Sequence, residues 1–244
     1  MNLFGLTGYP LGHSFSKEYF NNKFETEGRE DCYFDLFPLE RIDMLPGLLQ
    51  SQPSLKGLAV TIPYKESVMP YLQNISDEAK AIGAVNCIEF LPSGLKGHNT
   101  DIIGFAQSFT PLLQPNHSKA LVLGTGGASK AVQYVLKTSG IPFLLVSRTP
   151  DQGNISYTDI SQALLNEYHI IINSTPLGMS PNEGAAPLLP YHFIGSNHYL
   201  YDLVYKPAET KFLQEGKSRG AVIKNGYEML LLQAEENWKI WNAS

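Results

Sequence analysis

The chain has 244 residues, enough for one large or two modest domains. Its 43% hydrophobic and 17% charged residues are typical of a core-forming globular protein and exclude a disordered one. A formal net charge of -5 without a basic run argues against nucleic-acid and anionic-membrane partners, whereas an anionic small molecule needs only local donors.

Cys32 and Cys87 are the only cysteines, and two thiols this far apart indicate neither a zinc site nor a disulfide framework. We therefore expect no metal. The start of the chain, Met1–Gly5, lacks the basic segment and apolar run of a secretory signal. No stretch approaches the roughly 20 apolar residues that span a bilayer. We expect a soluble cytoplasmic protein.

The first hundred residues alternate between strand-like and helix-like segments. Apolar or alternating stretches predict strands, the last two forming a hairpin, at 3–9, 32–37, 57–62, 84–90 and 95–97. Helical spacing and a cap at Ser76 or Asp77 predict helices at 16–27, 39–49 and about 77–82.

The second half of the chain alternates again. A helix at about 102–113 is expected to carry the chain into another domain, where strands and helices are predicted at 120–124, 128–138, 143–147, 159–167, 169–173, 199–204 and 210–218. This alternation predicts a parallel, doubly wound sheet. The segment 176–195 is expected to be a long functional loop, and a final helix is expected at 227–241.

A glycine-rich turn, Gly124-Thr125-Gly126-Gly127, separates an apolar strand from a helix that begins near Ala128. Glycines let the backbone approach a pyrophosphate, and the helix N-terminus offers N–H groups and positive dipole charge. The next strand ends in Ser147-Arg148-Thr149, where an NAD site usually has an acid for the ribose 2′-hydroxyl. A cation between two hydroxyls suits a 2′-phosphate. The pattern predicts an NADP site and redox chemistry, with an ordinary tight turn as the alternative.

Polar side chains follow or precede the predicted strands of the first domain. They supply three hydroxyls, an amide, an ammonium and a carboxylate, from Ser14, Ser16, Thr61, Asn86, Lys65 and Asp101. Such a set suits a polyhydroxylated, carboxylated ring. Hydride transfer to a ketone leaves an alkoxide, which Lys65 can protonate while a carboxylate holds the lysine. Singly, each residue is more often a helix cap or a surface side chain; their joint occurrence favours a site.

Together these motifs resemble the shikimate dehydrogenase family, whose enzymes reduce 3-dehydroshikimate to shikimate with NADPH in aromatic amino acid biosynthesis. The resemblance runs nearly end to end and includes Asn99–Gly104, Asn173–Met179 and Tyr201–Tyr205. It implies a two-domain α/β fold, with a substrate domain at 1–102 plus 226–244 and a Rossmann-type NADP domain at 103–225.

The resemblance also implies that the domains face each other across a cleft and that the C-terminal helix packs back on the first. The expected partner is a small-molecule substrate, with the protein a monomer or homodimer.

The resemblance further implies a role for each site residue. Lys65 would be the acid/base group and Asp101 its partner. The substrate would be bound at its carboxylate and ring hydroxyls by Ser14, Ser16, Tyr205, Thr61, Asn86, Asp101 and Gln233. The cofactor would contact Gly124, Gly126, Gly127, Ala128, Ser129, Ser147, Arg148, Thr149, Thr175, Leu203 and Gly226.

The chain departs from the family pattern at several positions. Ser147 stands where the family usually has Asn. A serine keeps a hydrogen bond but reaches less far than the asparagine amide. His98 stands where Asp is frequent, and we expect it on a surface loop. Tyr227 and Glu228 replace the usual Leu-Gly near the expected nicotinamide pocket. His13 is a candidate catalytic base because imidazoles in general titrate near neutrality. Our preferred interpretation instead places it behind the Ser14 loop.

Two alternatives stay open. Within the same class, the enzyme accepts quinate or uses NAD. In a different class, the chain is a non-catalytic regulator that binds NADP or shikimate, although a binding module gains nothing from Lys65 and Asp101. Another amino- or hydroxy-acid dehydrogenase does not explain the hydroxyls of Ser14, Ser16 and Thr61 together.

Overall fold

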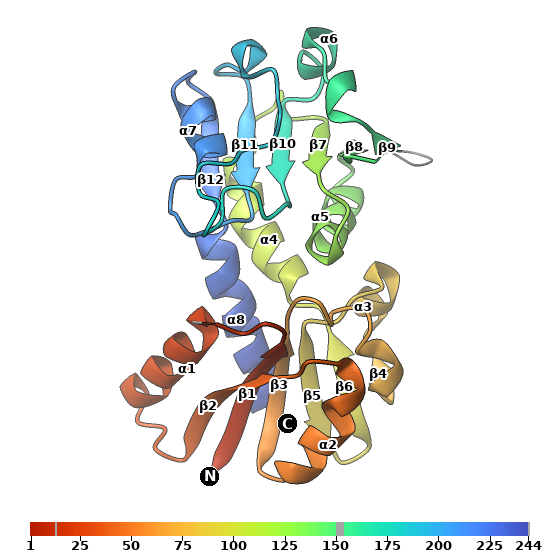
Figure 1. The fold of residues 1–244 in the computed structure, drawn as a ribbon, viewed down its shortest axis with the longest axis vertical. Helices are drawn as coiled ribbons and strands as arrows, with labels where there is room; N and C mark the ends of the chain where they lie inside the picture. The colour runs from red at the N-terminus through yellow and green to blue at the C-terminus, as the bar shows by residue number, and fades with distance from the viewer. Residues whose placement is uncertain (13, 150–153, 244) are drawn as a thin grey trace. The chain divides into compact units, whose positions relative to one another are not determined.

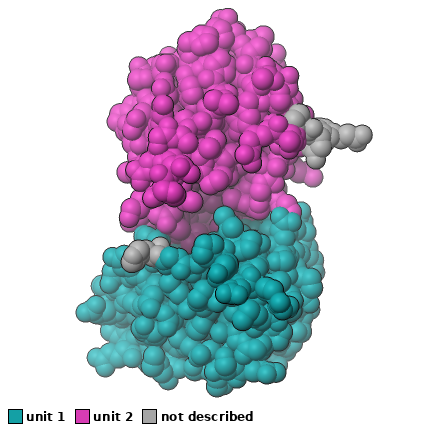
Figure 2. Space-filling view, in the orientation of Figure 1, with its two compact units in different colours: residues 1–100, 234–244 teal, residues 101–233 magenta. Residues whose placement is uncertain are grey.

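The structure, a computed structural model, describes residues 1–12, 14–149 and 154–243, which form two compact units (Figures 1 and 2). Unit 1 comprises residues 1–100 and 234–244, and unit 2 comprises residues 101–233. Each unit contains a six-stranded sheet. The chain passes from unit 1 to unit 2 at Thr100-Asp101 and returns within helix α8 (Tyr227–Asn242).

The sheet of unit 1 is mixed, in the order β2-β1-β3-β5-β6-β4. Its strands are β1 (Asn2–Gly8), β2 (Cys32–Pro38), β3 (Leu55–Val60), β4 (Asn74–Ile75), β5 (Cys87–Leu91) and β6 (Gly94–His98). Strand β1 runs parallel to β2 and β3, whereas β5 runs antiparallel to both β3 and β6. The carboxyl ends of β1, β3 and β6 therefore share one edge of the sheet with the amino end of β5.

Helices cover both faces of this sheet; they are α1 (Phe15–Thr26), α2 (Leu45–Ser51) and α3 (Asp77–Ile82), with 3-10 turns η1 (Ile42–Met44) and η2 (Met69–Tyr71). Phe20 of α1 and Trp238 and Trp241 of α8 pack with Phe4 of β1. The Trp241 indole N–H donates to the Ile88 carbonyl at 3.0 Å. The C-terminal helix thus packs on the first sheet, as predicted.

The sheet of unit 2 is parallel throughout, in the order β12-β11-β10-β7-β8-β9. Its strands are β7 (Ala120–Leu123), β8 (Phe143–Val146), β9 (Asn154–Ile155), β10 (Ile170–Asn173), β11 (Tyr199–Asp202) and β12 (Val222–Asn225). Every residue of β7, β10 and β11 is buried, as parallel strands covered on both faces require. The predicted doubly wound sheet is confirmed.

Two helical layers sandwich this sheet (Figure 1). The helices of unit 2 are α4 (Asp101–Phe109), α5 (Gly127–Thr138), α6 (Gln162–Leu165) and α7 (Lys211–Lys217), with 3-10 turns η3 (Thr110–Leu112), η4 (Tyr157–Asp159) and η5 (Tyr191–Phe193). Phe105 of α4, Val132 of α5 and Met229 of α8 join one core; Phe212 of α7 and Leu165 of α6 join the other.

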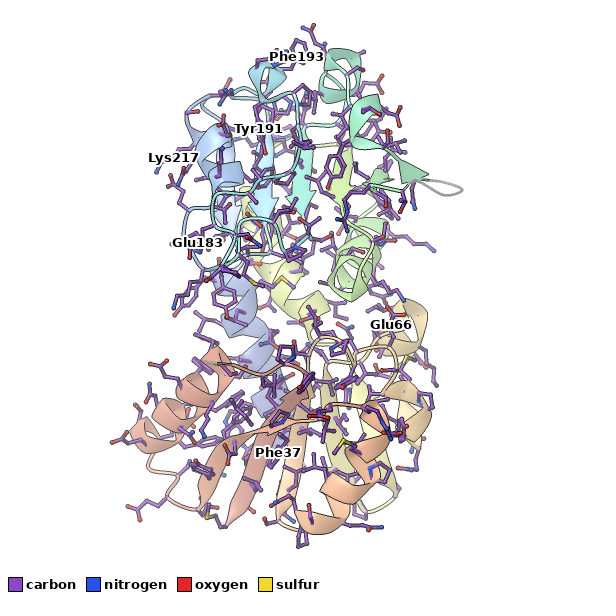
Figure 3. All side chains as sticks on the ribbon, viewed as in Figure 1. Phe37, Glu66, Glu183, Tyr191, Phe193 and Lys217 are labelled. Atoms are coloured by element: carbon purple, nitrogen blue, oxygen red, sulfur yellow. The ribbon has the colours of Figure 1, made fainter. Side chains whose placement is uncertain are left out.

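The segment 176–195 is the predicted long connection and contains only turns and η5. Figure 3 shows Glu183 and Phe193 on this segment, towards opposite ends of the strands of unit 2. The Tyr191 hydroxyl donates to the Pro187 carbonyl at 2.8 Å, and Leu189 and Ile194 join the core of unit 2, so the connection is packed against its unit.

Several local expectations differ from the structure. The helical segment predicted from residue 39 begins only at Ile42, and β3 ends at Val60 rather than at residue 62. The strands β4, β9 and β12 were not predicted, because two are only two residues long and β12 ends in Lys224 and Asn225.

The expectation of a surface loop for His98 is wrong. This residue ends β6, opposite Cys87, and its Nε2 lies 2.9 Å from Glu89 Oε2, with the His98 side chain 17% exposed. The cross-strand carboxylate gives the imidazole a partner inside the sheet. His13 lies outside the described residues.

Among the described residues, no helix is long and apolar enough to cross a membrane, and no cluster of histidine, cysteine and acidic residues is suited to a metal ion.

Candidate functional site

The polar residues predicted in unit 1 lie at one edge of its mixed sheet. Ser14 and Ser16 follow β1, Thr61 and Lys65 follow β3, and Asn86 precedes β5. The register Ala59–Cys87–His98 makes these chain ends neighbours, although the segments are distant in sequence. The sequence-predicted set is therefore brought together by the topology of the sheet.

Backbone hydrogen bonds connect the segments at this edge. The Thr61 N–H donates to Thr7 O at 2.9 Å, and the Val85 N–H donates to Lys65 O at 2.7 Å. The backbone that carries Lys65 is therefore fixed to the segment that precedes β5. The lysine side chain is only partly exposed.

Ser14 occupies the N-cap position of α1 in extended backbone (φ -103°, ψ 122°). In the part of the chain that the structure describes, its hydroxyl makes no capping hydrogen bond to the helix. The first turn of this 12-residue helix also contains Ser16. Two hydroxyls at a helix N-terminus suit a carboxylate, because the helix dipole and free N–H groups favour negative charge there.

A buried network of uncharged groups fixes the start of α4. The Thr100 N–H donates to Asn86 Oδ1 at 2.7 Å, and the Asn86 amide donates to Thr100 Oγ1 at 3.0 Å. The Thr100 hydroxyl donates to Asn237 Oδ1 of α8 at 2.6 Å. All three residues are at least 97% buried. Asp101, the next residue, is buried and begins α4, so this network sets its position.

Asn99 is a candidate that the sequence interpretation missed. Its amide donates to Ala84 O at 3.0 Å, whereas its Oδ1 is buried and has no partner among the described protein atoms. A buried acceptor without a partner favours a bound water or ligand hydroxyl. The only sequence signal was its place beside Thr100 and Asp101.

The glycine turn of unit 2 has the predicted form. Gly124 adopts φ +101°, and an added Cβ would lie 2.9 Å from Thr175 Cγ2. Gly126 is the N-cap of α5, and around it a Cβ would meet open space. The turn therefore leaves room beside a helix N-terminus, which fits a pyrophosphate.

Ser129 stabilises this turn from inside the helix. Its N–H and its hydroxyl both donate to Gly126 O, at 2.9 and 2.7 Å. At the end of β8, the Thr149 N–H donates to Ser147 Oγ at 3.3 Å, and Arg148 and Thr149 are exposed. Since β7 and β8 are parallel neighbours, the glycine turn and the Ser147–Thr149 segment lie at the same edge.

The remaining predicted residues of unit 2 also follow strands at this edge. Thr175 follows β10, Leu203 and Tyr205 follow β11, and Gly226 follows β12. A Cβ on Gly226 would lie 2.1 Å from Leu203 O, so only glycine permits this approach. Burial raises the pKa of Tyr205, which keeps its phenol a hydrogen-bond donor at neutral pH.

Helix α8 begins directly after Gly226, and its residues 227–233 belong to unit 2. The carboxylate of Glu228 pairs with Lys224 of β12, and Tyr227 is 46% exposed. The Gln233 amide donates to Leu230 O at 3.0 Å.

A lysine and hydroxyls at the sheet edge of one α/β unit, and a glycine turn on the parallel sheet of the other, are typical of a nicotinamide-dependent oxidoreductase. Residues 6–88 match the family model of the shikimate dehydrogenase substrate binding domain. Shikimate dehydrogenase (NADP(+)) of Carboxydothermus hydrogenoformans is 38% identical over 256 residues, covering 98% of this chain and 91% of that relative. The chain belongs to the shikimate dehydrogenase family.

Solved structures confirm the fold class. Shikimate dehydrogenase of Aquifex aeolicus superposes with a TM-score of 0.88 at 32% identity, covering 100% of this chain and 93% of the other. The enzyme of Thermus thermophilus, in complex with NADP(H) and shikimate, gives a TM-score of 0.88 at 30% identity, covering 100% and 94%.

Proposed function

We propose that this chain catalyses the reversible, NADP-dependent reduction of 3-dehydroshikimate to shikimate. The proposal is based on 38% identity to a shikimate dehydrogenase (NADP(+)) over 98% of this chain. The clustering of Ser14, Thr61, Lys65 and Asn86 at one sheet edge supports it, since the topology was not part of the sequence pattern.

Most of the residues proposed for the substrate site lie in unit 1. The hydroxyls of Ser14 and Ser16, with that of Tyr205, would bind the carboxylate, and Thr61, Asn86, Asp101 and Gln233 would bind ring hydroxyls. The Asn86 amide is hydrogen-bonded to Thr100, the residue before Asp101. Asn86 would therefore help to position Asp101 as well as contact the ligand. Lys65 would donate the proton to the alkoxide oxygen, with Asp101 orienting its ammonium and lowering the cost of charge there.

Unit 2 would contain the NADP site, where the bound nucleotide supplies the hydride. The residues present fit it: the turn has open space beside Gly126 that a side chain there would fill, and α5 has no acidic residue in its first turn. Arg148, between Ser147 and Thr149, would bind the 2′-phosphate. Thr175, Leu203 and Gly226 would line the nicotinamide end.

A matrix of two substrates and two cofactors tests this proposal. The purified protein is mixed with shikimate or quinate and with NADP or NAD, and formation of reduced nicotinamide is followed by absorbance. Fast turnover with shikimate and NADP alone is expected. Turnover with quinate or NAD would support a broader quinate/shikimate dehydrogenase. Ligand binding without turnover in any combination would support a regulator.

A further inference from the structure

A fully buried carboxylate ends strand β11 in unit 2. Asp202 is 0% exposed, and its two oxygens accept three hydrogen bonds. Oδ1 accepts from the Asn173 amide at 2.9 Å and from the Val204 N–H at 3.0 Å. Oδ2 accepts from the Thr210 hydroxyl at 2.5 Å. Burying a carboxylate is costly unless it is hydrogen-bonded. The three donors around Asp202 meet this requirement.

The hydrogen bonds continue from Asp202 into the loop that follows β10. Asn173 Oδ1 accepts from the Thr175 hydroxyl at 2.6 Å and from the Thr175 N–H at 3.1 Å. The Leu177 N–H donates to Thr175 Oγ1 at 3.3 Å. One carboxylate thereby fixes the orientation of the Asn173 amide, and that amide fixes Thr175.

The same carboxylate fixes the loop that follows β11. The Val204 N–H binds Asp202 directly, and the Leu203 N–H donates to Asn173 O at 2.9 Å. Gly226 is attached in turn, since its N–H donates to Val204 O at 3.3 Å. Thr175, Leu203 and Gly226, the three residues proposed for the nicotinamide end, are thus each within two hydrogen-bonded steps of Asp202.

We propose that Asp202 is a positioning residue for the nicotinamide half of the cofactor site, acting through Asn173 and Val204 on Thr175, Leu203 and Gly226. This inference rests on the proposed function. The glycine turn at Gly124 and the Ser147–Thr149 segment, proposed for the other half of the nucleotide, make none of the hydrogen bonds described for Asp202. The two halves of the cofactor therefore depend differently on this carboxylate.

The carboxylate is suited to this position because all three of its partners donate. An asparagine at 202 keeps one acceptor oxygen for Asn173 and Val204 but turns an N–H₂ group towards Thr210. It should preserve most of the loop geometry. An alanine leaves three buried donors without an acceptor, and the ends of both loops are then free to shift.

Binding of two ligands by Asp202→Ala and Asp202→Asn tests the inference. NADPH reports on the whole cofactor site, whereas adenosine 2′,5′-bisphosphate reports only on the adenosine half. We expect Asp202→Ala to weaken NADPH binding about tenfold or more. Binding of adenosine 2′,5′-bisphosphate should stay within about twofold of wild type. Asp202→Asn should restore most of the NADPH affinity.

Matched variants separate positioning from damage to the fold. Glu167→Ala removes an exposed carboxylate of the same unit that pairs with Lys119, and it should change neither affinity. If Asp202→Ala does not fold, Asn173→Ala interrupts the same connection to Thr175 and should give the same selective loss. Thermal unfolding confirms that each variant is folded at the assay temperature.

An equal loss of both ligands, or no loss of NADPH binding by a folded Asp202→Ala, would overturn the positioning role. A wild-type protein that binds neither ligand would instead overturn the proposed function, and this inference with it. The two failures are therefore distinguishable.

Discussion

The candidate edges of the two units are built on different kinds of buried network. In unit 1, the described hydrogen bonds among Asn86, Thr100 and Asn237 join amide and hydroxyl groups. In unit 2, a carboxylate, Asp202, is at the centre. Amide and hydroxyl groups neither gain nor lose a proton near neutrality. A carboxyl group can, so the hydrogen bonds that it accepts from the loops depend on pH. The proposed substrate edge is thus supported by described hydrogen bonds between uncharged groups, and the proposed cofactor edge by hydrogen bonds to a carboxylate.

The largest expected effect separates chemistry from binding at the substrate edge. Lys65→Ala should lower kcat by about 10³-fold, because the ammonium acts chiefly as the alkoxide forms, and should change the KM for shikimate far less. Steady-state kinetics measure both parameters. Lys56→Ala, at an exposed position of β3 in the same unit, is the control and should retain wild-type kinetics. A raised KM with unchanged kcat would contradict the catalytic role.

Removing one hydroxyl from the neutral network tests unit 1. Thr100→Val keeps the shape of the buried residue but removes the hydrogen bonds that its hydroxyl makes to Asn86 and Asn237. We expect a loss of about 2 kcal/mol in the free energy of unfolding, and a lower kcat because Asp101 is adjacent. Urea denaturation measures the stability. Thr138→Val, at the exposed end of α5, is the control. Equal stability of both variants would show that the network does not hold this edge.

How far the sequence predicts these edges depends on the range of the interactions. The glycine turn at Gly124, a cap at Ser76 or Asp77 (the structure has Ser76) and the hairpin of β5 and β6 are local, and each was predicted because the residue types favour the geometry. The parallel direction of β7, β8, β10 and β11 was predicted from the alternation of strands and helices, but their order in the sheet was not.

The buried networks were not predicted, because their partners are distant in the chain. Asn237 lies 137 residues from Thr100, and nothing in the spacing connects them. Asp202 was visible within a motif, but its contact with Asn173 depends on strand pairing. His98 was misplaced for the same reason, since its partner Glu89 is on the neighbouring strand.

The charged network of unit 2 predicts a pH dependence that the neutral one lacks. Burial raises the pKa of Asp202 to about 6, although hydrogen bonds from Thr210, Val204 and Asn173 oppose this. The folded protein then binds a proton that the unfolded chain has already lost near pH 4. The stability from this group is therefore present at low pH and is lost as the pH rises through about 6.

Asp202→Asn removes the titratable carboxyl group, so the difference between wild type and variant isolates its contribution to stability. The wild type should lose about 2 kcal/mol relative to Asp202→Asn between pH 4.5 and pH 7.5, in unfolding free energies from urea titrations. Thr100→Val provides the comparison for unit 1, and its difference from wild type should not change over that range. A constant difference for Asp202→Asn would mean that the carboxyl does not titrate with a raised pKa.

The smallest expected effect concerns the adenosine end of the cofactor edge. Arg148 is exposed and follows β8, so we expect the 2′-phosphate contact proposed for its cation to be partly solvated. Arg148→Ala should raise the KM for NADP about tenfold, leave kcat nearly unchanged, and leave the KM for NAD unaffected, because NAD lacks the 2′-phosphate. Arg219→Ala, which removes a guanidinium paired with Glu215 in the same unit, is the matched control. Equal losses for NADP and NAD would place the Arg148 contact elsewhere on the nucleotide, and selectivity would then rest on the hydroxyls of Ser147 and Thr149.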